Sequence, residues 1–167
     1  MKIKLLPIVC LFLLSLSCTT TKQNGAFVVD KRHAQFRVGV LPDTWEQKSF
    51  RNTDLFFEHT SKDASIYLSV QCEQFSDSPL EALMAQMLVE LGRYEVLSQQ
   101  RITLAKREAL VTEVKVNLDG VDRFVKIMVL RKNRCLFDAV LSSRTQSDEL
   151  VRDFDTMVNT FNAEADL

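Results

Sequence analysis

The sequence predicts an α+β protein in which an antiparallel β-sheet is flanked by helices. Three observations predict this fold class. Several segments alternate apolar and polar residues with the two-residue period of a strand that buries one face. Two other segments repeat apolar residues every three or four positions, as amphipathic helices do. Their order along the chain is strands, helix, strands, helix, which is typical of helices packed on an antiparallel sheet.

Four segments show the strand period most clearly. Their apolar sides carry Phe36, Val38 and Val40; Leu55, Phe57 and His59; Ile66, Leu68, Val70 and Cys72; and Leu110, Thr112, Val114, Val116 and Leu118. Asp119-Gly120 then predicts a tight hairpin, because both residue types tolerate positive φ. The next strand, Val121 to Arg131, is apolar on both faces and turns at Lys132-Asn133 into Cys135 to Leu141. Such strands lie in the middle of a sheet that is covered on both sides.

The two helical segments have clear apolar stripes. The first, between Pro79 and Gly92, carries Leu80, Leu83, Met84, Met87, Leu88 and Leu91. The second carries Leu150, Val151, Phe154, Met157, Val158 and Phe161. Proline at a helix start and glycine just past a helix end are typical boundary residues.

The N-terminus indicates export and lipidation. Lys2 and Lys4 precede an apolar run of about a dozen residues, too short for a bilayer core that needs roughly 20 helical residues. The ending Ser15-Leu16-Ser17-Cys18 resembles a bacterial lipobox, with Ser15 where Leu is usual. The resemblance implies cleavage before Cys18 and a diacylglycerol on its thiol. The alternatives are a plain signal peptide with an incidental cysteine, or a short buried helix.

These features divide the chain into four parts. Residues 1–17 are expected to be the lipoprotein signal peptide, 18–25 a polar lipidated tether, 26–162 a single domain and 163–167 a C-terminal tail. We therefore expect the protein on the extracytoplasmic side of a membrane. In a Gram-negative host, Thr19 after the lipidated cysteine favours the periplasmic face of the outer membrane.

Composition and motifs argue against several functions. With 21 basic and 22 acidic residues the chain has no basic surplus for nucleic acid. No glycine-rich loop or Gly-x-Ser-x-Gly motif is present, and His59, Glu58, His33 and Cys72 lack the spacing of metal ligands. We expect no enzymatic activity, no metal and no cofactor apart from the lipid on Cys18.

Three further residues have two interpretations each. Cys72 and Cys135 form an even pair in an exported domain and are disulfide candidates, or else are small buried apolar residues. Trp45 is expected to fill the core or close it against the sheet. Its functional alternative is an aromatic wall of a ligand pocket.

The order of elements resembles the PsbP-like α/β/α sandwich superfamily. The likeness rests on Phe36-Arg37-Val38-Gly39-Val40-Leu41-Pro42, on Trp45, on the hairpin at Asp119-Gly120 and on Phe154, Met157, Val158 and Phe161. It spans about Phe27 to Phe161; Thr44 stands before the tryptophan where Gly is common. The resemblance implies the fold and a tendency to bind other proteins, and it supplies no catalytic motif.

The resulting functional hypothesis is a membrane-anchored accessory module that binds another envelope protein. An edge strand such as Phe36–Val40 is one place where a partner strand could pair. The alternative is a carrier of a small apolar ligand or lipid, with Trp45 and phenylalanine side chains lining a cavity between helix and sheet.

Overall fold

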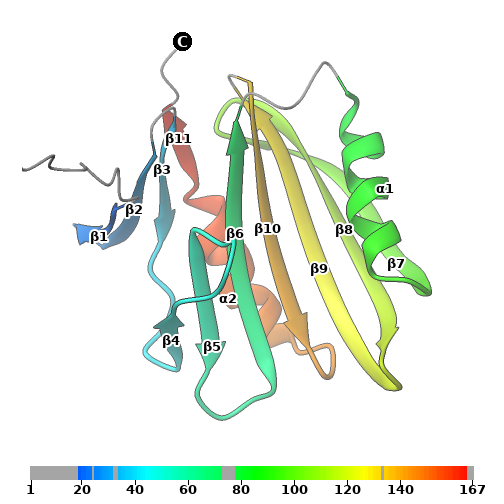
Figure 1. Cartoon of the computed structure of the whole chain (residues 1–167). Helices are drawn as coiled ribbons and strands as arrows, with labels where there is room; N and C mark the ends of the chain where they lie inside the picture. Colours follow the sequence, from blue (N-terminus) through cyan, green and yellow to red (C-terminus); the bar gives the residue numbers. More distant parts are fainter. Residues whose placement is uncertain (1–18, 24, 32–33, 73–77, 133, 165–167) are drawn as a thin grey trace, which may run out of the picture.

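A computed structural model describes residues 19–23, 25–31, 34–72, 78–132 and 134–164, which form two antiparallel sheets and two helices (Figure 1). The larger sheet, in spatial order, consists of β4 (Trp45–Lys48), β5 (Leu55–His59), β6 (Ala64–Cys72), β10 (Cys135–Ser143), β9 (Val121–Lys132), β8 (Arg107–Leu118) and β7 (Tyr94–Leu104). The smaller sheet consists of β1 (Thr19–Gln23), β2 (Ala26–Lys31), β3 (Ala34–Gly39) and β11 (Asn162–Glu164). The helices are α1 (Leu80–Glu90) and α2 (Asp148–Asn159). This arrangement confirms the α+β fold class.

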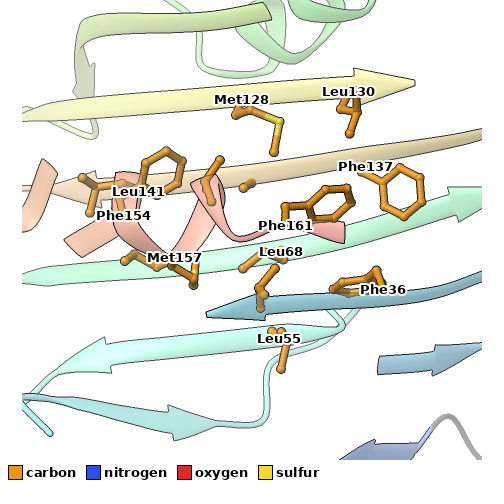
Figure 2. Close-up of a cluster of buried hydrophobic side chains, with 14 of the residues drawn as sticks. Phe36, Leu55, Leu68, Met128, Leu130, Phe137, Leu141, Phe154, Met157 and Phe161 are labelled. Carbon is orange, nitrogen blue, oxygen red and sulfur yellow. The ribbon is translucent and has the colours of Figure 1, made fainter. Parts of the chain in front are cut away.

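The two faces of the larger sheet are covered by different elements. On one face α1 packs over β8 and β9, burying Leu83, Met84 and Leu88 against the sheet. On the other face lie α2 and the smaller sheet. Figure 2 shows side chains of α2, β3 and the larger sheet meeting in that core, among them Phe36 and Phe154.

Strand β9 shows why the sequence pattern predicts this layering. Val125, Ile127 and Val129 lie in the α1 core, whereas Met128 and Leu130 lie in the α2 core. The strand is therefore apolar on both faces because helices cover both. The predicted hairpin before it is also confirmed, since Asp119 and Gly120 have φ of 52° and 85°.

Both ends of the predicted domain need correction. Residues 19–23, expected within a polar tether, form β1 and pair in register with β2. Residues 163 and 164, expected in a C-terminal tail, belong to β11, which pairs with β3. Strand pairing uses backbone groups, so these short segments join a sheet without the alternating apolar residues that predict strands.

The neighbours of β3 also correct one expectation about edges. β3 lies between β2 and β11, so the segment Phe36–Val40 is not a free edge strand. The edges of the larger sheet are β4 and the eleven-residue β7. Sequence patterning does not reveal β7, because most of its side chains are exposed on both faces.

Within the described residues, neither helix is long and apolar enough to cross a membrane.

Candidate functional site

Cys72 and Cys135 lie side by side at one end of the larger sheet. Cys72 ends β6 and Cys135 begins β10, and the two are direct partners in the strand register. Their Cα atoms are 4.1 Å apart and their sulfur atoms form a disulfide. The sequence left open whether these cysteines are bridged or are small buried apolar residues, and in the structure they are bridged. Cys18, which the sequence predicts as the lipid-attachment residue, lies outside the described residues.

Trp45 is a core residue. It is buried, and its Nε1 atom donates a hydrogen bond of 2.9 Å to Oδ2 of Asp153 on α2. Its ring meets the ring of His59 edge-to-face, with centroids 5.1 Å apart. Trp45 therefore closes the core between β4 and α2, which is the core role that the sequence predicts for it.

Two of the residues considered as metal ligands, His59 and Cys72, have other partners in the structure. His59 is buried, and its Nδ1 atom accepts hydrogen bonds from the backbone N–H groups of Ser61 and Lys62, at 3.2 and 3.1 Å. Cys72 is in the disulfide. His33 lies outside the described residues. Among the described residues, no three His, Cys, Asp or Glu side chains are grouped to hold a metal ion.

The aromatic side chains expected to line an apolar cavity pack against one another instead. Ring centroids of Phe36 and Phe137 are 6.0 Å apart, and those of Phe137 and Phe161 are 5.1 Å apart. Figure 2 shows these three rings pointing toward one another between β3, β10 and the chain after α2. The space between α2 and the sheet is therefore occupied here by the protein's own side chains.

A candidate binding site lies on the opposite face of the sheet, beside α1. Because α1 sits over β8 and β9, the part of this face that belongs to β6 and β10 extends beyond the helix (Figure 1). A groove of about 350 Å³ occupies this place. It is lined by Phe50, Asn52, Thr53, Tyr67, Ser69, Gln71, Leu83, Gln86, Met87, Glu90, Leu136 and Asp138. We call it the α1–β6 groove.

The α1–β6 groove is built by β6, β10, α1 and the segment between β4 and β5. Its floor consists of alternate residues of β6 and β10, which point away from the α2 core. One wall is the side of α1 that carries Gln86 and Glu90, and the other is the segment between β4 and β5. At that rim Phe50 is 62% exposed, and its ring stacks on Phe56 with centroids 4.9 Å apart. The groove thus has an exposed aromatic rim.

Among the described residues that line the α1–β6 groove, the charged side chains are acidic. Asp138 on the floor is 7% exposed and Glu90 on the helix wall is exposed, whereas no Lys, Arg or His is among the lining residues. Burial, together with the charges of Asp138 and then Glu90, raises the pKa of Tyr67 to about 12. The field of both carboxylates therefore reaches the hydroxyl group on the floor.

The residues of this groove, including the buried carboxylate of Asp138, were not identified from the sequence. Asp138 lies in the middle of β10, opposite Ser69 of β6 and Val129 of β9, on the same face as Leu136 and Val140. Burying a carboxylate in a sheet is costly compared with burying an apolar side chain. The available signal is that Asp138 is the one charged residue in the apolar run Cys135 to Leu141.

Solved structures identify the fold. No protein-family model and no curated protein matches this sequence. The chain is similar to CyanoP, the cyanobacterial PsbP of Synechocystis sp. PCC 6803, with a TM-score of 0.59 and 13% identity over 89% of this chain and 98% of that one. It is similar to LpqN, involved in cell envelope biogenesis of Mycobacterium tuberculosis, with a TM-score of 0.56 and 16% identity over 88% and 90%.

A third similar structure comes from Bacteroides thetaiotaomicron VPI-5482, with a TM-score of 0.54 and 11% identity over 79% of this chain and 45% of that chain. At such identities the likeness shows the fold alone. The PsbP-like α/β/α fold implied by the sequence resemblance is thereby confirmed.

Proposed function

We propose that this chain, whose fold is PsbP-like, is a non-catalytic accessory module of the cell envelope. In this proposal a lipid on Cys18 holds it on the extracytoplasmic side of a membrane, and the α1–β6 groove binds another envelope protein. The observation that carries the proposal is the groove itself, a sheet face left partly open beside α1.

The lining of the groove is suited to protein recognition. It combines apolar side chains such as Leu136 and Met87 with amide, hydroxyl and carboxylate groups, and it has the exposed ring of Phe50 at its rim. Aromatic and methionine side chains are enriched in protein interfaces, where polar groups fix the register of the partner. An open groove of this kind can accept a side chain or a short segment that projects from another surface.

The position of the anchor supports a partner on the same membrane. β1 begins at Thr19, directly after the cysteine that we propose is lipidated. The folded body would therefore lie close to the lipid surface, where an anchor raises the effective concentration of partners confined to the same layer. The similar protein LpqN is described as involved in cell envelope biogenesis, which agrees with this setting.

The proposal is tested by site-specific photocrosslinking in intact cells. Gln86 is exposed and lines the groove, so Gln86→p-benzoylphenylalanine places a crosslinker at the proposed contact. Ala85 is exposed on the same helix outside the groove, so Ala85→p-benzoylphenylalanine is the matched control. We expect one stoichiometric envelope-protein adduct from position 86 and none from position 85. Equal adducts at both positions, or none, would contradict the proposal.

A further inference from the structure

The first strand determines where the proposed membrane anchor meets the folded domain. β1 begins at Thr19, directly after Cys18, and all five of its residues pair in register with β2. As a free tether, residues 18–25 could extend by roughly 25 Å, at about 3.3 Å per residue. Pairing with β2 removes most of that reach, because these residues belong to the smaller sheet. A lipid on Cys18 would therefore emerge at the β1 edge of this sheet.

The smaller sheet has one face that points away from the core. Phe27 and Phe36 lie in the α2 core, so the residues that alternate with them along β2 and β3 point outward. One row of the strand register crosses this outer face through all the strands of the sheet, and it consists of Thr21, Val28, Arg37 and Asn162. We call this surface the outer face of the smaller sheet.

The chemistry of the outer face fits phospholipid headgroups. Its exposed side chains in that row are the hydroxyl of Thr21, the guanidinium of Arg37 and the amide of Asn162, all of which can donate hydrogen bonds to phosphate oxygens. Lys22, exposed on β1, adds a cation beside the anchor. Asp30 is the acidic side chain described on this face, and it already has an interaction of its own. Basic side chains next to a membrane are attracted by anionic lipids.

The exposed apolar side chains of the described chain lie elsewhere. They are found at the groove rim, on α1, on β7 and at the start of β9: Phe50, Val89, Tyr94, Val96, Leu97 and Val121. The described part of the smaller sheet has none, so its outer face suits the polar headgroup layer rather than the acyl chains. The smaller sheet and α1 lie on opposite sides of the larger sheet (Figure 1). Two packed layers, roughly 20 Å, therefore separate α1 from the smaller sheet.

We infer that the outer face of the smaller sheet rests on phospholipid headgroups, so that the α1–β6 groove opens away from the membrane. This inference rests on the proposed function, because it requires the lipid on Cys18. It adds a lipid-binding surface and the orientation of the anchored domain. The partner protein then reaches the groove from the side of the domain that is farthest from the bilayer.

The test compares how close two positions lie to the lipid surface. The full-length lipidated chain carries a thiol-linked fluorophore at Thr21→Cys, on the outer face, or at Val89→Cys, on α1, where the native side chain is 72% exposed. Cys72 and Cys135 are bridged, so the reagent reacts with the introduced thiol. Vesicles of phosphatidylglycerol and phosphatidylcholine carry a nitroxide quencher on the headgroup. We expect quenching at position 21 to exceed quenching at position 89 at least about threefold, because two layers separate them.

A charge reversal tests the contact itself. Arg37→Glu replaces a cation of the outer face with an anion and should reduce the ratio of the two quenching efficiencies at least about twofold. Arg93→Glu is the matched control, because Arg93 is exposed between α1 and β7, outside the smaller sheet, and this ratio should not change. Thermal unfolding of each labelled chain shows whether it folds. Asn162→Cys, on the same face, replaces Thr21→Cys if that variant does not fold.

The possible outcomes separate the inference from the proposed function. Equal quenching at positions 21 and 89 would mean that the domain tumbles on its anchor, and stronger quenching at position 89 would mean the reverse orientation. Either result would overturn the inference and leave the proposed function standing. Quenching at neither position of a vesicle-bound chain would mean that a second copy covers this face, which also overturns the inference. A chain that does not bind vesicles lacks the anchor, and both proposals would then fail.

Discussion

Gly39 of β3 and Thr160, the residue that follows α2, are so close that a Cβ on Gly39 would lie 2.6 Å from the Thr160 Oγ1 atom. This Oγ1 also donates a hydrogen bond of 2.7 Å to the carbonyl oxygen of Met157, which holds the threonine side chain in place. The contact fixes the distance between the smaller sheet and the end of α2. Glycine is therefore required at position 39 by packing rather than by backbone conformation.

Gly39→Ala should destabilise the protein by about 1–3 kcal/mol, because the added methyl group forces α2 and β3 apart. Thr160→Ala removes the atom that clashes, so the cost of Gly39→Ala should be smaller in that background. Chemical unfolding of the four chains measures the coupling, which we expect to be about 1 kcal/mol. Additive effects of the two substitutions would show that the contact is looser than described.

The same region shows how far the sequence predicts the fold. The apolar stripe of α2, including Phe154 and Met157, predicts both the helix and its buried side, because one side of the helix faces the core. The smaller sheet was not predicted, because β1 is polar and β11 has three residues. Such strands are specified by backbone pairing with β2 and β3, and only the folded chain brings those partners close.

The candidate site was predictable in part. The alternation along β6 correctly separates Ile66 and Leu68 from Tyr67 and Ser69, so it predicts which residues face away from the α2 core. The groove, however, exists because α1 lies over β8 and β9 rather than over β6. The position of a helix on a sheet cannot be predicted from a local sequence pattern. The pairing of β6 with β10, which places Ser69 beside Asp138, is likewise a long-range outcome.

The disulfide predicts a large stability difference between oxidised and reduced protein. Cys72 and Cys135 are 63 residues apart in sequence, so the bridge removes much conformational freedom from the unfolded chain. The double variant Cys72→Ser, Cys135→Ser should be less stable by about 2–4 kcal/mol. Alkylation of the unfolded protein should gain two groups after reduction, and two free thiols without reductant would contradict the bridge.

Membrane attachment is predicted to depend on Cys18. Cys18→Ala removes the thiol that would accept diacylglycerol, so the protein should leave the membrane fraction and lose labelling by radioactive palmitate. Cys10→Ala is the matched control, because Val9 before it is not the small residue that such processing favours, and it should label normally. Unchanged labelling of Cys18→Ala would refute the lipobox interpretation. The description of the folded domain does not depend on this result.

The titration of Tyr67 is predicted to report the charge of the groove. The chain has two tyrosines, so Tyr94→Phe leaves Tyr67 as the single tyrosine signal in ultraviolet absorbance. Its midpoint should lie near pH 12, because burial and the charges of Asp138 and Glu90 raise the pKa of its hydroxyl. Asp138→Asn removes one of these charges and should lower the midpoint, whereas Glu58→Gln, outside the groove, should not.

The same shift has a consequence for stability at alkaline pH. The unfolded chain releases the Tyr67 proton near its ordinary pKa of 10.0, and the folded chain holds it to about 12. Stability from this group is therefore complete below pH 10 and is lost as the pH rises from about 10 to about 12, by about 2–3 kcal/mol at most. Denaturant unfolding across this range should show a smaller loss for Tyr67→Phe than for the tyrosine-containing chain. If both chains lose the same unfolding free energy, and the Tyr67 hydroxyl titrates at its ordinary pKa, then this hydroxyl is open to solvent. The floor of the groove would then not be buried as described.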